Sequence, residues 1–236
     1  MGEAQLLGMR YDNGGGAGCS EEEAGMAAYF VRRLVLSAAG VVSGVKPASL
    51  FNFMPQSCMH CRDTSGAVCR AARETIAVGA RSLARFGVTL VVLDRRGGKS
   101  VLFAYRDACL AQILEKPECA AFLEGLGYDV SSVGSVVHEL RRRMADYYGS
   151  PDRMAPYPHE VGLLLGYPLV DVQGFMAGEH ETCRGSWKAY GDEEAAQEVF
   201  AQVKRCERRC WERFKEGESL EELLRLPVTR LTLGVA

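Results

Sequence analysis

The chain has 236 residues, 47% of them hydrophobic and 25% charged, which are ordinary values for a folded globular protein. They exclude a collagen, a coiled-coil rod and a largely disordered chain. Lys and Arg number 28 against 30 Asp and Glu, so the formal net charge at pH 7 is −2, and no sustained basic tract is present. We therefore expect no nucleic-acid partner, because a binder of the phosphate backbone concentrates positive charge on one face.

The N-terminal residues 1–18 contain one Arg and no apolar run, so they are predicted to be a flexible leader and not a secretion signal. Residues 19–236 are expected to form a single domain. The longest uncharged stretch near the start, residues 34–45, has 12 residues and falls short of the ~20 that a membrane span needs. We expect no membrane association and a cytoplasmic location. The odd count of nine cysteines is typical of reduced thiols.

The first half of the chain contains one clear pattern, at residues 88–105. Two segments rich in β-branched residues flank the pair Gly97-Gly98, which predicts a β-hairpin. Helix caps and apolar periodicity predict the other elements. These are a helix over residues 20–39 that begins at the N-cap Ser20 and is ended by Gly40 and Gly44, an extended segment over residues 46–53, and a helix from Asp63 or Thr64 to about Gly87.

The second half is predicted to be mostly helical, with one more strand. The predicted elements are short helices over residues 108–114 and 118–126, a helix over 132–148, two short helices over 159–165 and 169–176, a strand over 184–190, and a long helix from the cap Asp192 to about Lys215. Helices and strands come in groups and do not alternate strictly. We therefore expect an α+β fold with a small, mostly antiparallel sheet of about four strands flanked by helices.

Cys58 and Cys61 form a C-x-x-C pair that suggests a zinc or thiol site. A closed zinc site needs four ligands, and Cys206 and Cys210 could complete it, although both fall on an apolar helical stripe that faces the core. The pair also follows a possible strand and precedes a helix, as redox dithiols do. Free thiols without a ligand are the simpler interpretation.

His159 and Glu160 open a predicted helix and are the candidate catalytic residues. An imidazole titrates near neutral pH, and a carboxylate beside it could bind or transfer a proton. Residue 163 is Leu, so the H-E-x-x-H pattern of zinc proteases is absent. The alternative is a helix cap, in which Glu160 only complements the helix dipole.

Aromatic and cationic side chains predict a ligand-binding pocket. Trp187 and Lys188 alternate with small residues and could stack on a flat ligand or hold an anion, although such alternation also fits a half-buried strand. Arg106 follows the predicted hairpin and could grip a carboxylate or phosphate as a planar fork. The candidate ligand-binding residues are Lys46, Tyr105, Arg106, Tyr167, Trp187 and Lys188.

A long motif covers residues 158–168, PHEVGLLLGYP, and continues with Asp171-Val172, Gly174-Phe175 and residues 187–190, WKAY. Together with residues 44–51, GVKPASLF, and with Tyr105-Arg106 and Gly127-Tyr128, it resembles the bacterial family catalogued as domain of unknown function 3793. The likeness covers about residues 22–214. The family often has His-Cys where this chain has Ser37-Ala38, which argues against a shared thiol nucleophile. The resemblance implies a small cytoplasmic protein of anaerobic bacteria and supplies no established activity.

These observations predict a protein that binds a small anionic or planar ligand or a metal chelate, and they leave open whether it is an enzyme. Iron or haem handling is one form of this prediction, since His, Tyr and carboxylate side chains are iron-compatible ligands. One alternative is a protein-interaction module in which the motifs serve only the fold. Another is a thiol or zinc protein acting through Cys58 and Cys61. No motif predicts the cofactor or the oligomeric state.

Overall fold

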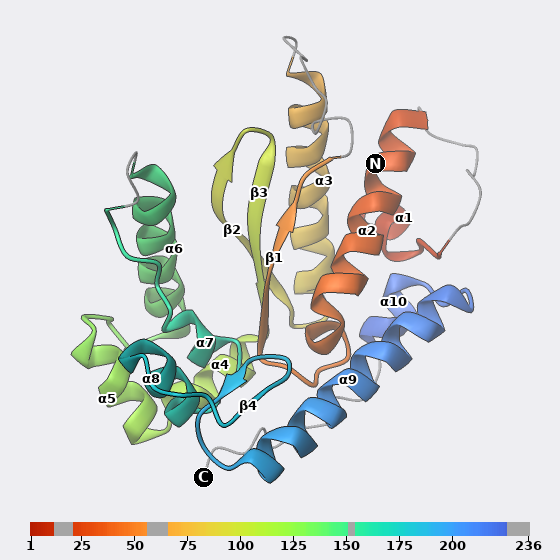
Figure 1. Ribbon diagram of the computed structural model, residues 1–236. Helices are drawn as coiled ribbons and strands as arrows, with labels where there is room; N and C mark the ends of the chain where they lie inside the picture. Colours follow the sequence, from red (N-terminus) through yellow and green to blue (C-terminus); the bar gives the residue numbers. More distant parts are fainter. Residues whose placement is uncertain (12–20, 56–65, 151–153, 226–236) are drawn as a thin grey trace.

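The computed structural model describes residues 1–11, 21–55, 66–150 and 154–225 (Figure 1). Its main sheet has three strands in the order β1-β3-β2, with both pairs antiparallel, and a smaller sheet pairs two short strands. The predicted α+β fold with a small antiparallel sheet is confirmed. The strands are β1 (Ala48–Phe53), β2 (Thr89–Arg96), β3 (Lys99–Tyr105), β4 (Cys183–Arg184) and β5 (Lys188–Ala189).

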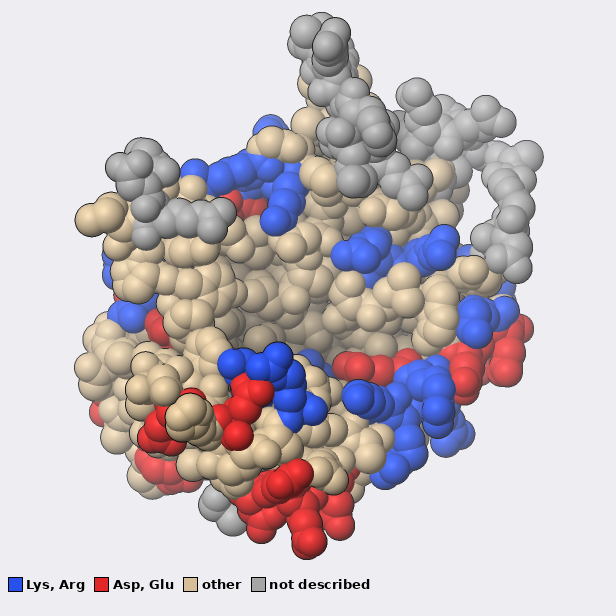
Figure 2. Space-filling model, in the orientation of Figure 1, with Lys and Arg blue, Asp and Glu red and all other residues tan. Residues whose placement is uncertain are grey.

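Helices surround the sheet on both faces, and one side of the molecule is left hollow. In the space-filling view, the hollow lies between α6 on one side and α2 with α3 on the other, above the β4 region (Figures 1 and 2). The described helices are α1 (Glu3–Leu7), α2 (Glu21–Val42), α3 (Ala67–Ala84), α4 (Asp107–Leu114), α5 (Pro117–Gly125), α6 (Val133–Gly149), α7 (Val161–Leu164), α8 (Leu169–Ala177), α9 (Glu193–Lys215) and α10 (Leu220–Leu224).

Local capping and turn chemistry explain the elements that were predicted best. The β2–β3 hairpin turns at Gly97 and Gly98, whose φ values of 53° and 78° are those a two-residue type I′ turn requires. The Ser132 side chain accepts a hydrogen bond from the Ser135 amide at the start of α6, and Asp192 accepts one from Ala195 at the start of α9. The predicted N-cap Ser20 and helix start at Asp63 or Thr64 lie outside the described residues.

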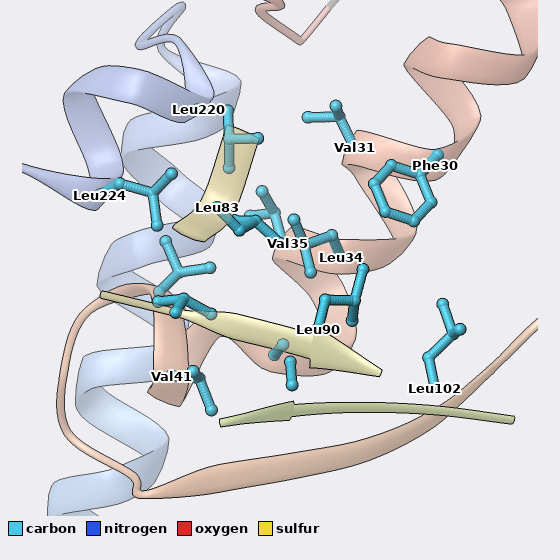
Figure 3. Packing of buried hydrophobic residues seen from close by; sticks show 14 of the residues in the cluster. Phe30, Val31, Leu34, Val35, Val41, Leu83, Leu90, Leu102, Leu220 and Leu224 are labelled. Atoms are coloured by element: carbon cyan, nitrogen blue, oxygen red, sulfur yellow. The ribbon is translucent and has the colours of Figure 1, made fainter. Parts of the chain in front are cut away.

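Two large apolar clusters lie on opposite faces of the main sheet. Leu102 belongs to the first cluster, with α1, α2, α3, α10 and the end of α9, whereas its neighbour Phe103 belongs to the second, with α4 to α8. Alternation along a strand sends successive side chains to opposite faces. Figure 3 shows the first cluster, in which Leu34 of α2 and Leu83 of α3 lie close to Leu90 of the sheet.

The first cluster accounts for the apolar character of α2. Within the described residues, one stretch, Gly25–Val42, is long and apolar enough to cross a membrane, with a mean hydropathy of 1.4 over 18 residues. The protein buries 56% of that stretch, and α2 contacts β1 and α9. Its composition is that of a core helix.

The structure differs from the prediction in three segments. Residues 1–18 were expected to be a flexible leader, but α1 forms there and its Leu6 and Leu7 are buried in the first cluster. The predicted strand over residues 184–190 is instead a hairpin of β4 and β5, since Gly185 turns back and lies against Phe200, where a β-carbon would come within 2.1 Å of the ring. Helix α2 continues through Gly40 to Val42, with non-helical dihedrals at Ala38.

Candidate functional site

The loop that leads into β1 carries a largely buried lysine. Lys46 precedes β1, and its side chain crosses α2 at Gly40, where a β-carbon would lie 2.7 Å from Cδ and 2.8 Å from Cγ of the lysine. Burial lowers the pKa of Lys46, and the negative charge of Glu207 on α9 opposes that effect. Within the described part of the chain, the ammonium group makes no salt bridge or hydrogen bond.

A stack of aromatic rings faces this ammonium group. Lys46 Nζ lies 5.9 Å from the centre of the Tyr167 ring, and Tyr167 stacks on Trp187 with 4.8 Å between centroids and 21° between planes. Trp187 Nε1 donates a 2.6 Å hydrogen bond to Asp171 Oδ2, and the other oxygen of Asp171 accepts bonds from the amides of Tyr190 and Gly191. The buried Asp171 therefore fixes the indole, and with it the position of the Tyr167 ring.

We call these five residues, Lys46, Tyr167, Asp171, Trp187 and Glu207, the Lys46 cluster. They come from the loop before β1, the turn between α7 and α8, α8 itself, the β4–β5 hairpin and α9. Burial and the charge of Glu207 raise the pKa of Tyr167, so its phenol stays protonated and can donate a hydrogen bond. The cluster therefore offers a cation, a phenol and a flat aromatic surface.

Three further tyrosines continue from the Lys46 cluster toward the end of α6. The Tyr147 ring lies 5.1 Å from those of both Tyr148 and Tyr157, and all three side chains are half-buried. Burial, followed by the nearby phenols of Tyr148, Tyr147 and Tyr167, raises the pKa of Tyr157 to about 12. This tyrosine group, Tyr147, Tyr148 and Tyr157, was not among the predicted site residues. The available signal was three tyrosines close in sequence to the 158–168 motif.

His159 and Lys188 form a second, more exposed group. The His159 ring is 4.8 Å from Phe175 and 5.1 Å from Tyr157, and Lys188 Nζ is 5.8 Å from the centre of Phe175. Lys188 is paired with Glu181 at 2.9 Å. The imidazole therefore lies among aromatic rings, and Lys188, unlike Lys46, has an acidic partner.

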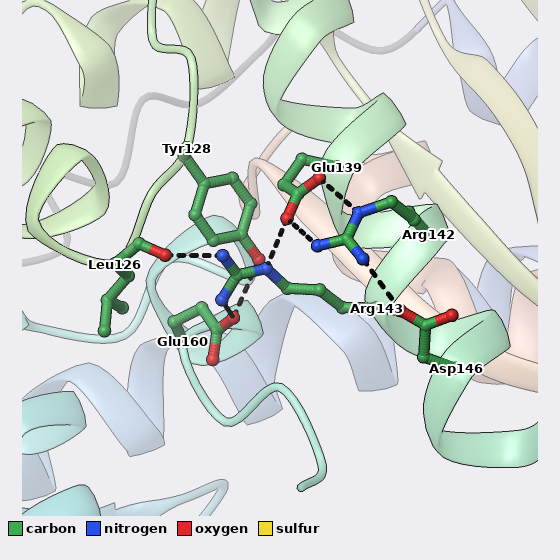
Figure 4. Close-up of polar contacts among 7 residues, drawn as sticks. All are labelled: Leu126, Tyr128, Glu139, Arg142, Arg143, Asp146 and Glu160. Carbon is green, nitrogen blue, oxygen red and sulfur yellow. Dashed lines mark hydrogen bonds and ion pairs between the residues drawn. The ribbon is translucent and has the colours of Figure 1, made fainter. Parts of the chain in front are cut away.

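Glu160 points away from this group, into a polar network with Tyr128 and Arg143 (Figure 4). Its carboxylate is 4% exposed and accepts hydrogen bonds from Tyr128 at 2.8 Å and from Arg143 at 3.0 Å. Arg143 also bonds Glu139 and lies 4.3 Å from the centre of the Tyr128 ring. Burial and the adjacent Glu160 raise the pKa of Tyr128 well above its usual range. The predicted His159–Glu160 pair is thus divided between two environments.

Arg106 and Tyr105 also serve the fold in this structure. The Arg106 guanidinium donates hydrogen bonds to three backbone carbonyls, those of Val41 at 2.9 Å and of Val42 and Phe86 at 3.1 Å each. These bonds tie the end of α2 to the loop after α3. Tyr105 is 5% exposed, and its ring lies 5.3 Å from Phe103 in the second apolar cluster. Burial is the main cause that raises the pKa of Tyr105.

The predicted metal ligands receive no support from the described residues. Across residues 1–11, 21–55, 66–150 and 154–225, no group of three or more His, Cys, Asp or Glu side chains is placed to hold a metal ion. Cys210 is buried in the first cluster, and burial raises the pKa of its thiol to about 12, so it does not readily form a thiolate ligand. Cys58 and Cys61 lie outside the described residues.

A separate cavity of about 290 Å³ lies between the N-terminus and α3, and its lining includes none of the predicted site residues that the structure describes. Its lining residues are Met1, Ala71, Glu74, Thr75, Ala77, Val78 and Arg81.

A family model described as "Protein of unknown function (DUF3793)" matches residues 34–224. The chain belongs to this family. The match confirms the resemblance carried by the 158–168 motif, and the matched range contains all eight predicted site residues together with the tyrosine group. No curated protein and no solved structure gives a significant match. For this DUF3793 chain, the geometry of the site is therefore the main guide to function.

Proposed function

We propose that the Lys46 cluster and the tyrosine group form the binding site for a small molecule that has an anionic group and a planar part. The observation that carries the proposal is the largely buried ammonium group of Lys46, which makes no salt bridge or hydrogen bond within the described residues and is attracted by Glu207 only at longer range. Burying an unpaired charge is costly, and an anionic ligand would supply the missing partner.

The surroundings of Lys46 support the planar part of this proposal. The stacked rings of Tyr167 and Trp187 are held in place by Asp171, and the half-buried Tyr157 lies close enough to Tyr167 for the two phenols to interact. Such a surface binds a flat group by stacking, and the phenols add hydrogen-bond donors. Haem, a planar molecule with two carboxylates, is one ligand of this class, and aromatic carboxylates and flavin phosphates are others.

The proposal is limited to binding, in a cytoplasmic protein without a nucleic-acid or membrane partner. Glu160 is occupied by Tyr128 and Arg143, so it is not available as an acid or base beside His159. Arg106 is occupied by three carbonyls. With these two removed from the predicted set, the remaining groups can hold a ligand.

The test is a ligand screen by melting temperature and calorimetry with two matched lysine variants. The panel is haemin, flavin mononucleotide, benzoate and inorganic phosphate. At least one planar anion should raise the melting temperature of the native protein. Lys46→Met should weaken its binding at least about tenfold, whereas Lys188→Met, which removes an exposed and paired lysine, should leave binding unchanged. The proposal fails if nothing in the panel binds, or if both variants weaken binding equally.

A second candidate function, a protein-interaction module, is favoured by the surface of α8. Val170, Phe175 and Met176 are 51%, 40% and 41% exposed there. Exposed apolar patches often mark protein contacts. Under this alternative, Phe175→Ser would abolish capture of one dominant partner in a pull-down while leaving the ligand screen unaffected.

A further inference from the structure

The backbone around Lys46 is held by hydrogen bonds on both sides. The amides of Val45 and Lys46 both donate to the carbonyl of Gly40, at 2.7 Å and 2.8 Å. On the other side, the carbonyl of Pro47 accepts a 2.9 Å bond from the amide of Arg106, the residue after β3. Val45 and Pro47 are both buried. The lysine side chain therefore starts from a fixed loop between α2 and β1.

The side chain of Lys46 is positioned along its whole length. Its Cγ and Cδ lie against Gly40, with no room between them for a β-carbon. Its Nζ lies 5.9 Å from the centre of the Tyr167 ring, and that ring stacks on Trp187. A long side chain held in this way has lost most of its rotamer freedom before a ligand arrives. The amine is thus preorganised beside a flat aromatic surface.

The amine itself is free to react. Among the residues that the structure describes, none pairs with Nζ by a hydrogen bond or a salt bridge, and Lys46 keeps some contact with solvent. Lys188, in contrast, is paired with Glu181 at 2.9 Å. Burial lowers the pKa of Lys46 against the attraction of Glu207, which increases the unprotonated fraction. An unprotonated lysine in a desolvated site is a nucleophile that attacks carbonyl groups.

We propose that Lys46 captures a planar, anionic aldehyde or ketone as a Schiff base. This inference rests on the proposed function, because the carbonyl compound must enter the same site. The amine nitrogen attacks the carbonyl carbon and forms a carbinolamine. The carbon–oxygen bond then breaks, and the oxygen leaves as water with the two protons of the amine, so that a carbon–nitrogen double bond remains. The step changes no oxidation state and needs no co-reactant. A protonated imine keeps a positive charge at Nζ for the anionic group of the ligand.

The test uses 4-carboxybenzaldehyde, a planar anionic aldehyde, with the full chain and sodium cyanoborohydride, which reduces an imine to a stable secondary amine. Mass spectrometry of the digested protein gives the rate of modification at each lysine. Lys46 should react at least about tenfold faster than Lys188 and than Lys204, an exposed lysine on α9. Benzoate, which has the same ring and carboxylate without the aldehyde, should slow the reaction of Lys46 and leave that of Lys204 unchanged.

Lys46→Arg provides a variant that keeps the positive charge and lacks the nucleophilic amine. The fast modification should be lost in this variant, while Lys188 and Lys204 react as they do in the native protein. Circular dichroism verifies that the variant is folded. The comparison among lysines within the native chain does not depend on the variant.

The outcomes separate this inference from the proposed function. If benzoate binds the native protein but Lys46 reacts no faster than Lys204, the site binds anions without a covalent step and the inference is wrong. If benzoate does not bind and Lys46 is not modified preferentially, both proposals fail. Rapid modification of Lys46 that benzoate does not slow would show a reactive lysine outside a ligand site, and it would also overturn the inference.

Discussion

The Glu160 network and the Lys46 cluster are two buried charged regions built from the same kinds of residue, and they differ in how completely the charges are paired. Around Glu160, the carboxylate, the guanidinium of Arg143 and the phenol of Tyr128 satisfy one another. Around Lys46, the cation faces an aromatic ring and has no acid within ion-pair distance in the described residues. A fully paired buried charge serves the fold, whereas an unpaired one leaves a place for a ligand.

The largest expected effect is the removal of Arg143 from the paired region. Arg143→Met leaves the Glu160 carboxylate, which is 4% exposed, without its cation. Breaking a buried ion pair in this way should lower the free energy of unfolding by about 3 kcal/mol, measured by urea denaturation. Arg142→Met is the control, since Arg142 is 57% exposed and its pairs should contribute less than about 1 kcal/mol. Equal losses in both variants would contradict the comparison.

A smaller effect is the acid sensitivity of the same region. The hydrogen bonds from Arg142, and then those from Arg143, lower the pKa of Glu139 to about 2. A lowered pKa in the folded state contributes stability at neutral pH, and that stability is lost as pH falls from the ordinary glutamate value of 4.5 toward 2. Glu139→Gln should therefore flatten the fall in unfolding free energy over this range by about 1 kcal/mol, because the exposed Arg142 contributes less than a buried partner would. If Glu139→Gln loses as much unfolding free energy over this pH range as the native protein does, Glu139 is not held in its ionised form.

The smallest expected effect is a gain in stability, and it concerns the Lys46 cluster. Lys46→Met replaces a largely buried ammonium group with an apolar side chain of similar shape. Without ligand, this variant should be more stable than the native protein by up to about 1 kcal/mol, measured by urea denaturation. Lys188→Met should show no gain, because Lys188 is exposed and paired with Glu181. A clear loss of stability in Lys46→Met would show that the ammonium group serves the fold.

Elements with local signals could be predicted from the sequence. The β2–β3 hairpin follows from Gly97-Gly98, and the starts of α6 and α9 follow from the caps Ser132 and Asp192, because each signal acts within a few residues. The sequence did not predict helix α1, because α1 lacks such a local signal. It has no side-chain cap, and its Leu6 and Leu7 are ordered by contacts with helices distant in the sequence.

The roles of the site residues depended on partners that no local pattern shows. Glu160 is bound by Tyr128, 32 residues before it, and Arg106 bonds the carbonyl of Val41, 65 residues before it. The sequence indicated which residues have side chains suited to binding or catalysis. Contacts with residues distant in the sequence then decided which of these side chains remain free to contact a ligand. Lys46, Tyr167 and Trp187 were predicted and are brought together, while Tyr157 was not predicted, because it lies in a loop and its tyrosine neighbours lie on α6.

The close contact between Gly40 of α2 and Lys46 has an evolutionary consequence. Position 40 has no room for a β-carbon because the stem of Lys46 occupies that space. The two positions should therefore covary among relatives that keep this fold. Chains with a larger residue at 40 should carry a short side chain at 46, and under the proposed function they should not bind the same ligand.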